Sequence, residues 1–154
     1  MEDEVTLLHF TDIYNLLSRR WREPVEGAAR LQSLLQSYAH ADPLVLFSGD
    51  ALSPSLECQA TSHMVDALNK LGVSATVPGN HEFDFGLDNF EEQVGRSSFP
   101  LVLSNLVQQK TGLPSSGVVP HLVVESHGHR VGLMGLVGDW MWKQVATRGE
   151  TCPH

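Results

Sequence analysis

The chain has 154 residues, of which 42% are hydrophobic and 18% are charged, a composition typical of a folded domain and too apolar for a disordered one. Its formal net charge of −8 makes nucleic acid an unfavourable partner. No apolar run approaches the ~20 residues of a membrane span, and the acidic start, residues 1–4, is unlike a signal peptide. We therefore expect one cytoplasmic domain without a membrane partner.

Strand and helix patterns alternate along the first hundred residues. Short apolar runs predict buried strands over residues 5–10, 44–47, 74–77 and 101–103. Apolar residues at steps of three and four predict helices over residues 25–40, 55–71 and 87–94. Such alternation predicts an α/β fold whose parallel strands are joined by right-handed crossovers.

The last third of the chain has a different pattern. Residues 106–120 are rich in Gly, Pro, Ser and Gln, which predicts a loop. Two apolar segments, 122–125 and 131–136, flank the polar residues 126–130 and predict a β-hairpin. His127 and His129 fall in the expected turn, where a solvent-exposed role is favoured over metal binding.

Polar residues follow each of the four predicted parallel strands. Asp12 ends the first, Asp50 the second, Asn80 and His81 the third and Asn105 the fourth. Because the carboxyl ends of parallel strands lie at one edge of a sheet, we expect these residues to gather there. Oxygen ligands suit divalent ions, and Asp50 could bridge two of them, with Asp12 on the first ion and Asn80 on the second. Taken singly, each residue is also a common turn former.

Three segments carry a resemblance to a known family. TLLHFTDIYN, LFSGDALSPS and VPGNHEFDFG stand in the order typical of the calcineurin-like metallophosphoesterases, and resemble in particular the 5′-nucleotidase and UDP-sugar hydrolase branch. The likeness extends over EGAAR, SNL and RVGLMGLVGDWMW. It implies an α/β fold of two packed sheets flanked by helices, here truncated, with residues 1–142 as a partial domain and 143–154 as a tail outside the family pattern.

The resemblance also implies roles for individual residues. Asp12 and Asp50 would hold one divalent ion, and Asp50 and Asn80 a second, with manganese, zinc, cobalt and calcium all left open. His81 would stabilise the phosphoryl transition state or protonate the leaving oxygen, and Asp84 would orient His81. The implied reaction is metal-dependent hydrolysis of a nucleotide or nucleotide-sugar substrate.

The sequence departs from the family pattern at several points. Tyr14 stands where the family has a histidine ligand, and the family's downstream Gly-His and Gly-His-x-His ligands would lie beyond residue 154. We therefore expect weak or partial metal binding and impaired activity; the alternative is a catalytically silent binding or regulatory fragment. Asp84 could instead cap the helix over 87–94, and Glu82 is expected to be structural.

Overall fold

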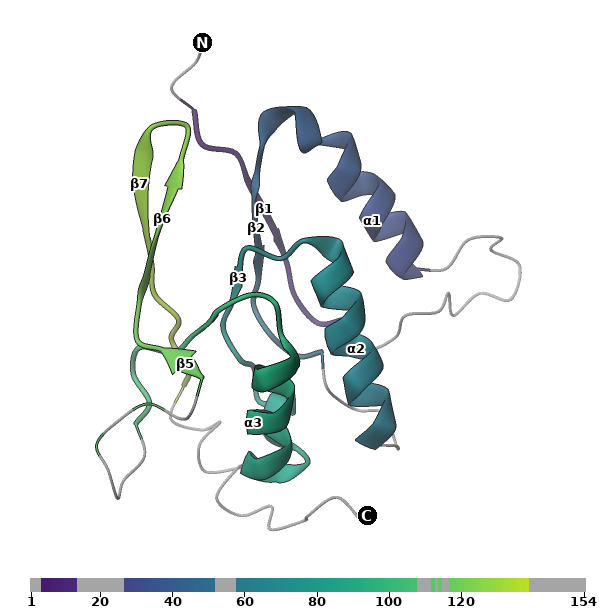
Figure 1. Ribbon diagram of the computed structural model, residues 1–154, viewed down its shortest axis with the longest axis vertical. Coiled ribbons are helices and arrows are strands. Elements are labelled where there is room, and N and C mark those ends of the chain that lie inside the picture. The colour runs from purple at the N-terminus through teal and green to yellow at the C-terminus, as the bar shows by residue number, and fades with distance from the viewer. Residues whose placement is uncertain are drawn as a thin grey trace.

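A five-stranded parallel sheet forms the centre of the molecule (Figure 1). The computed structural model describes residues 4–13, 27–51, 58–107, 112, 114 and 117–138, without the side chains of 58–62. The strands lie in the order of the sequence. They are β1 (Leu7–Phe10), β2 (Leu44–Phe47), β3 (Ala75–Thr76), β4 (Leu101–Val102) and β5 (Val118–Val119).

Helices connect the first four strands and pack on one side of the sheet (Figure 1). They are α1 (Gly27–Ser37), α2 (Cys58–Leu71) and α3 (Gly86–Arg96), with short 3₁₀ helices η1 (Ala39–Ala41) and η2 (His81–Phe83). The predicted α/β fold with a parallel sheet is confirmed. The expected loop over 106–120 was wrong at its end, because β5 pairs there with β4; two residues are too short to produce a periodic pattern.

The hairpin of β6 (Leu122–Ser126) and β7 (His129–Leu133) forms a second, antiparallel sheet on the side opposite the helices (Figure 1). Its turn is shorter than the 126–130 expected. His127 and Gly128 both have positive φ, 50° and 79°, as a two-residue turn of the primed type requires. The ladder therefore closes at Ser126 and His129. β7 ends at Leu133, before the predicted end at residue 136, because Gly135 forms hydrogen bonds with Ser104, which follows β4.

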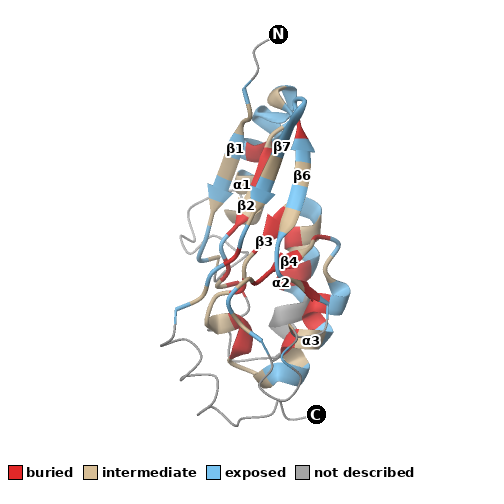
Figure 2. Cartoon of the chain, turned by 90° about the vertical axis from the view of Figure 1, so that its left-hand side faces the viewer, coloured by how far each residue is buried: buried red, intermediate tan, exposed pale blue. Residues whose placement is uncertain are grey.

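The hydrophobic core is formed by buried residues of the parallel strands and of the helices α2 and α3, and Figure 2 shows which parts of the chain are buried. Phe90 of α3 is 1% exposed, and its ring lies 4.5 Å from that of Phe83, measured between centroids. Phe47 of β2 packs against Phe10 of β1 at 5.1 Å. These contacts hold the carboxyl ends of the strands and η2 in one packed unit.

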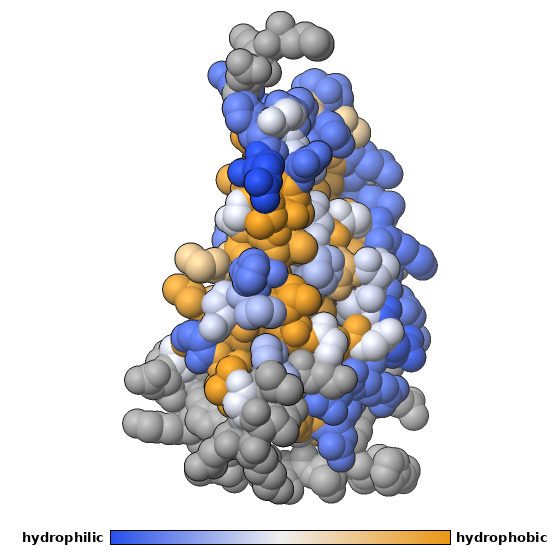
Figure 3. All heavy atoms as spheres, turned by 60° about the vertical axis from the view of Figure 1, so that its left-hand side comes forward, coloured by the Kyte–Doolittle hydropathy of each residue, from blue (hydrophilic) through white to orange (hydrophobic). Residues whose placement is uncertain are grey.

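The side of the molecule that carries the hairpin exposes apolar residues (Figure 3). Met134 is 75% exposed, Leu136 67% and Leu7 54%. Large exposed apolar side chains that gather on one face are typical of a surface that another element or molecule covers. Within the described part of the chain, no helix has the length and apolar character needed to cross a membrane.

Candidate active site at the carboxyl edge of the sheet

The loops that follow β1, β2 and β3 meet at one edge of the sheet. The Asp12 N–H donates to the carbonyl of Gly49 at 3.1 Å, which ties the first loop to the second. The His81 N–H donates to Asp50 Oδ1 at 3.1 Å, which ties the second to the third. The structure thus brings together the loops bearing the predicted residues Asp12, Asp50, Asn80 and His81.

Both predicted carboxylate ligands have an unfavourable backbone conformation. Asp12 has a φ of 59° and Asp50 a φ of 64°, in the left-handed region that costs a residue other than glycine about 1–3 kcal/mol. Such conformations persist only where surrounding contacts impose them, and they cluster at functional sites. Asp12 is exposed and Asp50 half-buried, and Thr11 Oγ1 donates to Asp12 Oδ2 at 2.9 Å.

The second and third loops approach each other so closely that glycine is required. We call residues 48–51 the β2 loop and residues 77–80 the β3 loop. A Cβ on Gly49 would overlap the backbone nitrogen of Gly79, and a Cβ on Gly79 would overlap the Asp50 carboxylate. Gly49 also has a φ of 80°, which only glycine adopts at no steric cost. Close packing of the two loops therefore requires a glycine directly before Asp50 and directly before Asn80.

Asp84 contacts the ring of His81. The distance from His81 Nδ1 to Asp84 Oδ2 is 2.7 Å, with side-chain exposures of 26% and 13%. A carboxylate at Nδ1 orients the imidazole and favours the proton on that nitrogen. The N-cap position of α3 is Phe85, so Asp84 does not occupy the capping position that was the alternative for it.

Glu82 has a larger part in the site than its sequence position suggested. Its carboxylate is 6% exposed and accepts three backbone N–H groups, from Asp50 at 2.9 Å, Ala51 at 2.7 Å and Gly79 at 2.5 Å. The pKa of Glu82 is raised above its ordinary value, chiefly because burial disfavours the charged carboxylate. The three backbone N–H groups act in the opposite direction, and the negative charge of Asp50 adds to the increase. The signal in the sequence was a glutamate directly before Phe83, one of two phenylalanines in HEFDF, because a carboxylate that is buried beside aromatic residues needs hydrogen-bond partners.

Asn105, which was expected at the same sheet edge, forms hydrogen bonds to the backbone of the segment after the hairpin. Its Nδ2 donates to the Val137 carbonyl at 2.7 Å, and its Oδ1 accepts the Val137 N–H at 3.0 Å. Beside it, Ser104 N–H donates to the Gly135 carbonyl at 2.7 Å. The side-chain amide of Asn105 thus bonds to the backbone of Val137 as a neighbouring strand would, and it connects the segment after the hairpin to the end of β4.

Replacing Asn105 by Ala should lower the free energy of unfolding by about 1–2 kcal/mol, because two hydrogen bonds to Val137 are lost at a partly solvated position. Urea denaturation measures the change, with the exposed Glu92→Ala as the control. Metal affinity should stay the same. A loss of metal affinity in the folded Asn105→Ala variant would instead place Asn105 in the metal site.

The donors at this edge fit a divalent cation in part. Two carboxylates, Asp12 and Asp50, and the amide of Asn80 are oxygen ligands of the kind that hard divalent ions take. Over the described ranges, no three His, Cys, Asp or Glu side chains form a group that could hold a metal ion, so an amide has to complete the set. Tyr14 lies outside the described residues.

Comparison with known proteins shows the family of the chain. A profile of the calcineurin-like phosphoesterase family matches residues 5–149. A Treponema pallidum protein named "Probable 5′-nucleotidase" is 28% identical over 147 residues, covering 86% of this chain and 25% of its own length. The mouse 5′-nucleotidase is 29% identical over 152 residues, with coverages of 86% and 26%.

A solved structure shows the same fold. The 5′-nucleotidase precursor from Thermus thermophilus superposes with a TM-score of 0.68 at 28% identity, covering 86% of this chain and 28% of that one. The chain thus spans about a quarter of the length of the relatives it matches. Because the family profile covers nearly all of the sequence, this chain belongs to the calcineurin-like phosphoesterase family.

Proposed function

We propose that the site is part of a metal-dependent phosphoester hydrolase centre of the 5′-nucleotidase type, with Asp12, Asp50 and Asn80 holding divalent cations. The observation that carries the proposal is the joining of the β2 and β3 loops, which sets Asp50 beside His81 and its partner Asp84. The family profile and the nucleotidase relatives support it.

The chain's own residues suit phosphoryl transfer. Divalent cations, when bound, supply Lewis-acid stabilisation of the charge that develops on the phosphoryl group. His81 stands next to Asn80 in the chain, and its Nδ1 is engaged by Asp84. In the imidazolium form, the other ring nitrogen, Nε2, also carries a proton, and this N–H is assigned to proton donation to the leaving oxygen or to a hydrogen bond to the phosphoryl group. Positioning and electrostatic stabilisation account for nearly all of the catalysis of this reaction.

Nucleotides are the proposed substrates, because the relatives that support the proposal are named as nucleotidases. The proposal covers nucleoside monophosphates and nucleotide sugars. The formal charge of −8 opposes the approach of polyanions such as nucleic acid, whereas a small phosphate ester needs favourable potential only at the site itself.

The chain should bind Mn²⁺ with a dissociation constant of about micromolar or weaker, because the described donors form an incomplete shell of two carboxylates and one amide. Titration calorimetry measures this, and Asp50→Ala should abolish binding. Tight binding of two ions per chain that survives dialysis would contradict the expectation and show that other residues complete the shell.

The proposed function is tested by phosphate release from AMP and by release of UMP and glucose 1-phosphate from UDP-glucose, each with and without Mn²⁺. We expect slow, Mn²⁺-dependent release that disappears in Asp50→Ala. Mn²⁺ binding without any release would instead favour the second candidate, a catalytically silent metal-binding fragment. The specific observation in favour of that candidate is the short donor set among the described residues.

A further inference from the structure

Glu82 bonds to both the β2 loop and the β3 loop, which carry two of the three proposed metal ligands, Asp50 and Asn80. We propose that Glu82 is a positioning residue, which holds the β2 and β3 loops in the one arrangement where Asp50 and Asn80 can share a metal centre. The inference rests on the proposed function. Glu82 itself touches neither substrate nor metal in this proposal, since both of its oxygens accept backbone N–H groups.

The hydrogen bonds cross between the loops in both directions. From η2, Glu82 accepts the N–H groups of Asp50 and Ala51 in the β2 loop and of Gly79 in the β3 loop. From the β2 loop, Asp50 Oδ1 accepts the N–H of His81 in η2. The carboxylate of Glu82 on η2 thus binds the backbone of the β2 loop, and the carboxylate of Asp50 in the β2 loop binds the backbone of η2. A shift of the β2 loop relative to η2 therefore breaks hydrogen bonds of both carboxylates.

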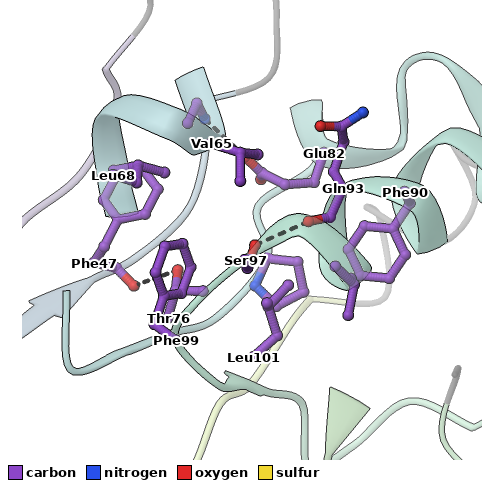
Figure 4. Close-up of a pocket in the computed structure, with 13 residues that line it drawn as sticks. Phe47, Val65, Leu68, Thr76, Glu82, Phe90, Gln93, Ser97, Phe99 and Leu101 are labelled. Carbon is purple, nitrogen blue, oxygen red and sulfur yellow. Dashed lines mark hydrogen bonds between the residues drawn. The ribbon is translucent and has the colours of Figure 1, made fainter. Parts of the chain in front are cut away.

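The surroundings of Glu82 make these bonds strong. Figure 4 shows its side chain in the interior among residues that include Val65, Phe90 and Gln93, and only 6% of it is exposed. Hydrogen bonds are electrostatically stronger where water is excluded, and a buried donor that loses its acceptor is correspondingly costly. The three N–H groups therefore depend on this one carboxylate.

The geometry requires a glutamate and not merely a polar residue. One oxygen accepts two N–H groups and the other accepts the third, so both must be acceptors. The amide of Gln offers one acceptor and would turn an NH₂ group toward an N–H. With Gln at position 82, the single carbonyl oxygen can serve either Asp50 and Gly79 or Ala51, so at least one N–H of the β2 loop faces an NH₂ group. With Ala, Asp50, whose φ of 64° is unfavourable, loses the acceptor of its own N–H as well. The β2 loop, which carries Asp50, is then free to relax to an ordinary backbone conformation.

Amide hydrogen exchange in the wild-type chain gives the first test, without any variant. The amides of Asp50, Ala51 and Gly79 should exchange slowly although they lie in loops, because each donates a hydrogen bond to the buried Glu82. Exchange as fast as that of an open loop at these three amides would overturn the inference, whatever the chain does with metal.

Mn²⁺ affinity of Glu82 variants gives the second test. In Glu82→Gln, compared at low temperature after circular dichroism has shown the variant to be folded, the dissociation constant should rise about 10- to 100-fold, the range seen when the partner of a metal ligand is lost. Glu82→Ala should weaken binding further, and the exposed Glu92→Gln should leave it unchanged. This ordering, with partial rescue by Gln, is not expected if Glu82 merely stabilises the fold.

The outcomes separate the two proposals. A folded Glu82→Gln chain that binds Mn²⁺ as the wild type does would overturn the positioning role and leave the proposed function intact. A wild-type chain that binds no Mn²⁺ would contradict the proposed function and with it the positioning role. If both Glu82 variants fail to fold, the exchange rates of the wild-type amides still decide whether the carboxylate holds the loops.

Discussion

Replacing His81 by Ala should reduce phosphoester turnover by about 10²- to 10⁴-fold while leaving the metal content nearly unchanged. Losing a positioned acid or electrostatic stabiliser has effects of this size. The backbone N–H of His81, which bonds to Asp50 Oδ1, is kept in the variant, so the ligand loops should stay in place. Steady-state rates with AMP and metal analysis of the same samples measure the two effects, in this chain and in a full-length relative with the same segments.

Asp50→Ala is the matched comparison for His81→Ala. It removes a proposed ligand and the acceptor of the His81 N–H together, so metal and activity should be lost in parallel. Asp84→Asn should keep its metal and lose less turnover than His81→Ala, because it weakens the partner of His81 Nδ1 without touching the ligand set. Equal metal loss from His81→Ala and Asp50→Ala would make His81 a ligand and would remove it from the role proposed here.

Phe90→Ala should have the largest effect on stability, about 3–5 kcal/mol in the free energy of unfolding. Phe90 is 1% exposed and contacts Phe83 of η2, the short helix that contains Glu82. Truncation would leave a cavity between α3 and the site loops. Urea denaturation should show a lower midpoint with an unchanged slope if only stability has changed.

The neighbouring Leu87 provides the control for that measurement. It lies on the same helix but is 37% exposed, so Leu87→Ala should cost much less than Phe90→Ala. Because Phe90 supports η2, Phe90→Ala should also weaken Mn²⁺ binding, and Leu87→Ala should not. A loss of less than about 1 kcal/mol in Phe90→Ala would mean that this part of the chain is not packed as described.

Much of the fold could be predicted from local pattern. The strand over Leu44–Phe47 was predicted with its observed bounds, because a buried parallel strand is apolar on both faces and is bounded by polar turn residues. The helix after residue 55 ends at Leu71 as expected, since Gly72 follows with a φ of 71°. β5 could not be predicted, because two residues carry no periodicity and their pairing with β4 depends on the tertiary fold.

The candidate site, too, could be predicted only in part from the sequence. The sequence by itself determined which residues stand at the strand ends, since Asp12, Asp50 and Asn80 each follow an apolar run within three residues. It also determined the spacing that allows Asp84 to reach His81. Hydrogen bonds between residues about thirty positions apart leave no mark on local pattern. Only the tertiary structure therefore decided that Asn105 bonds to Val137 and that Glu82 joins the two ligand loops.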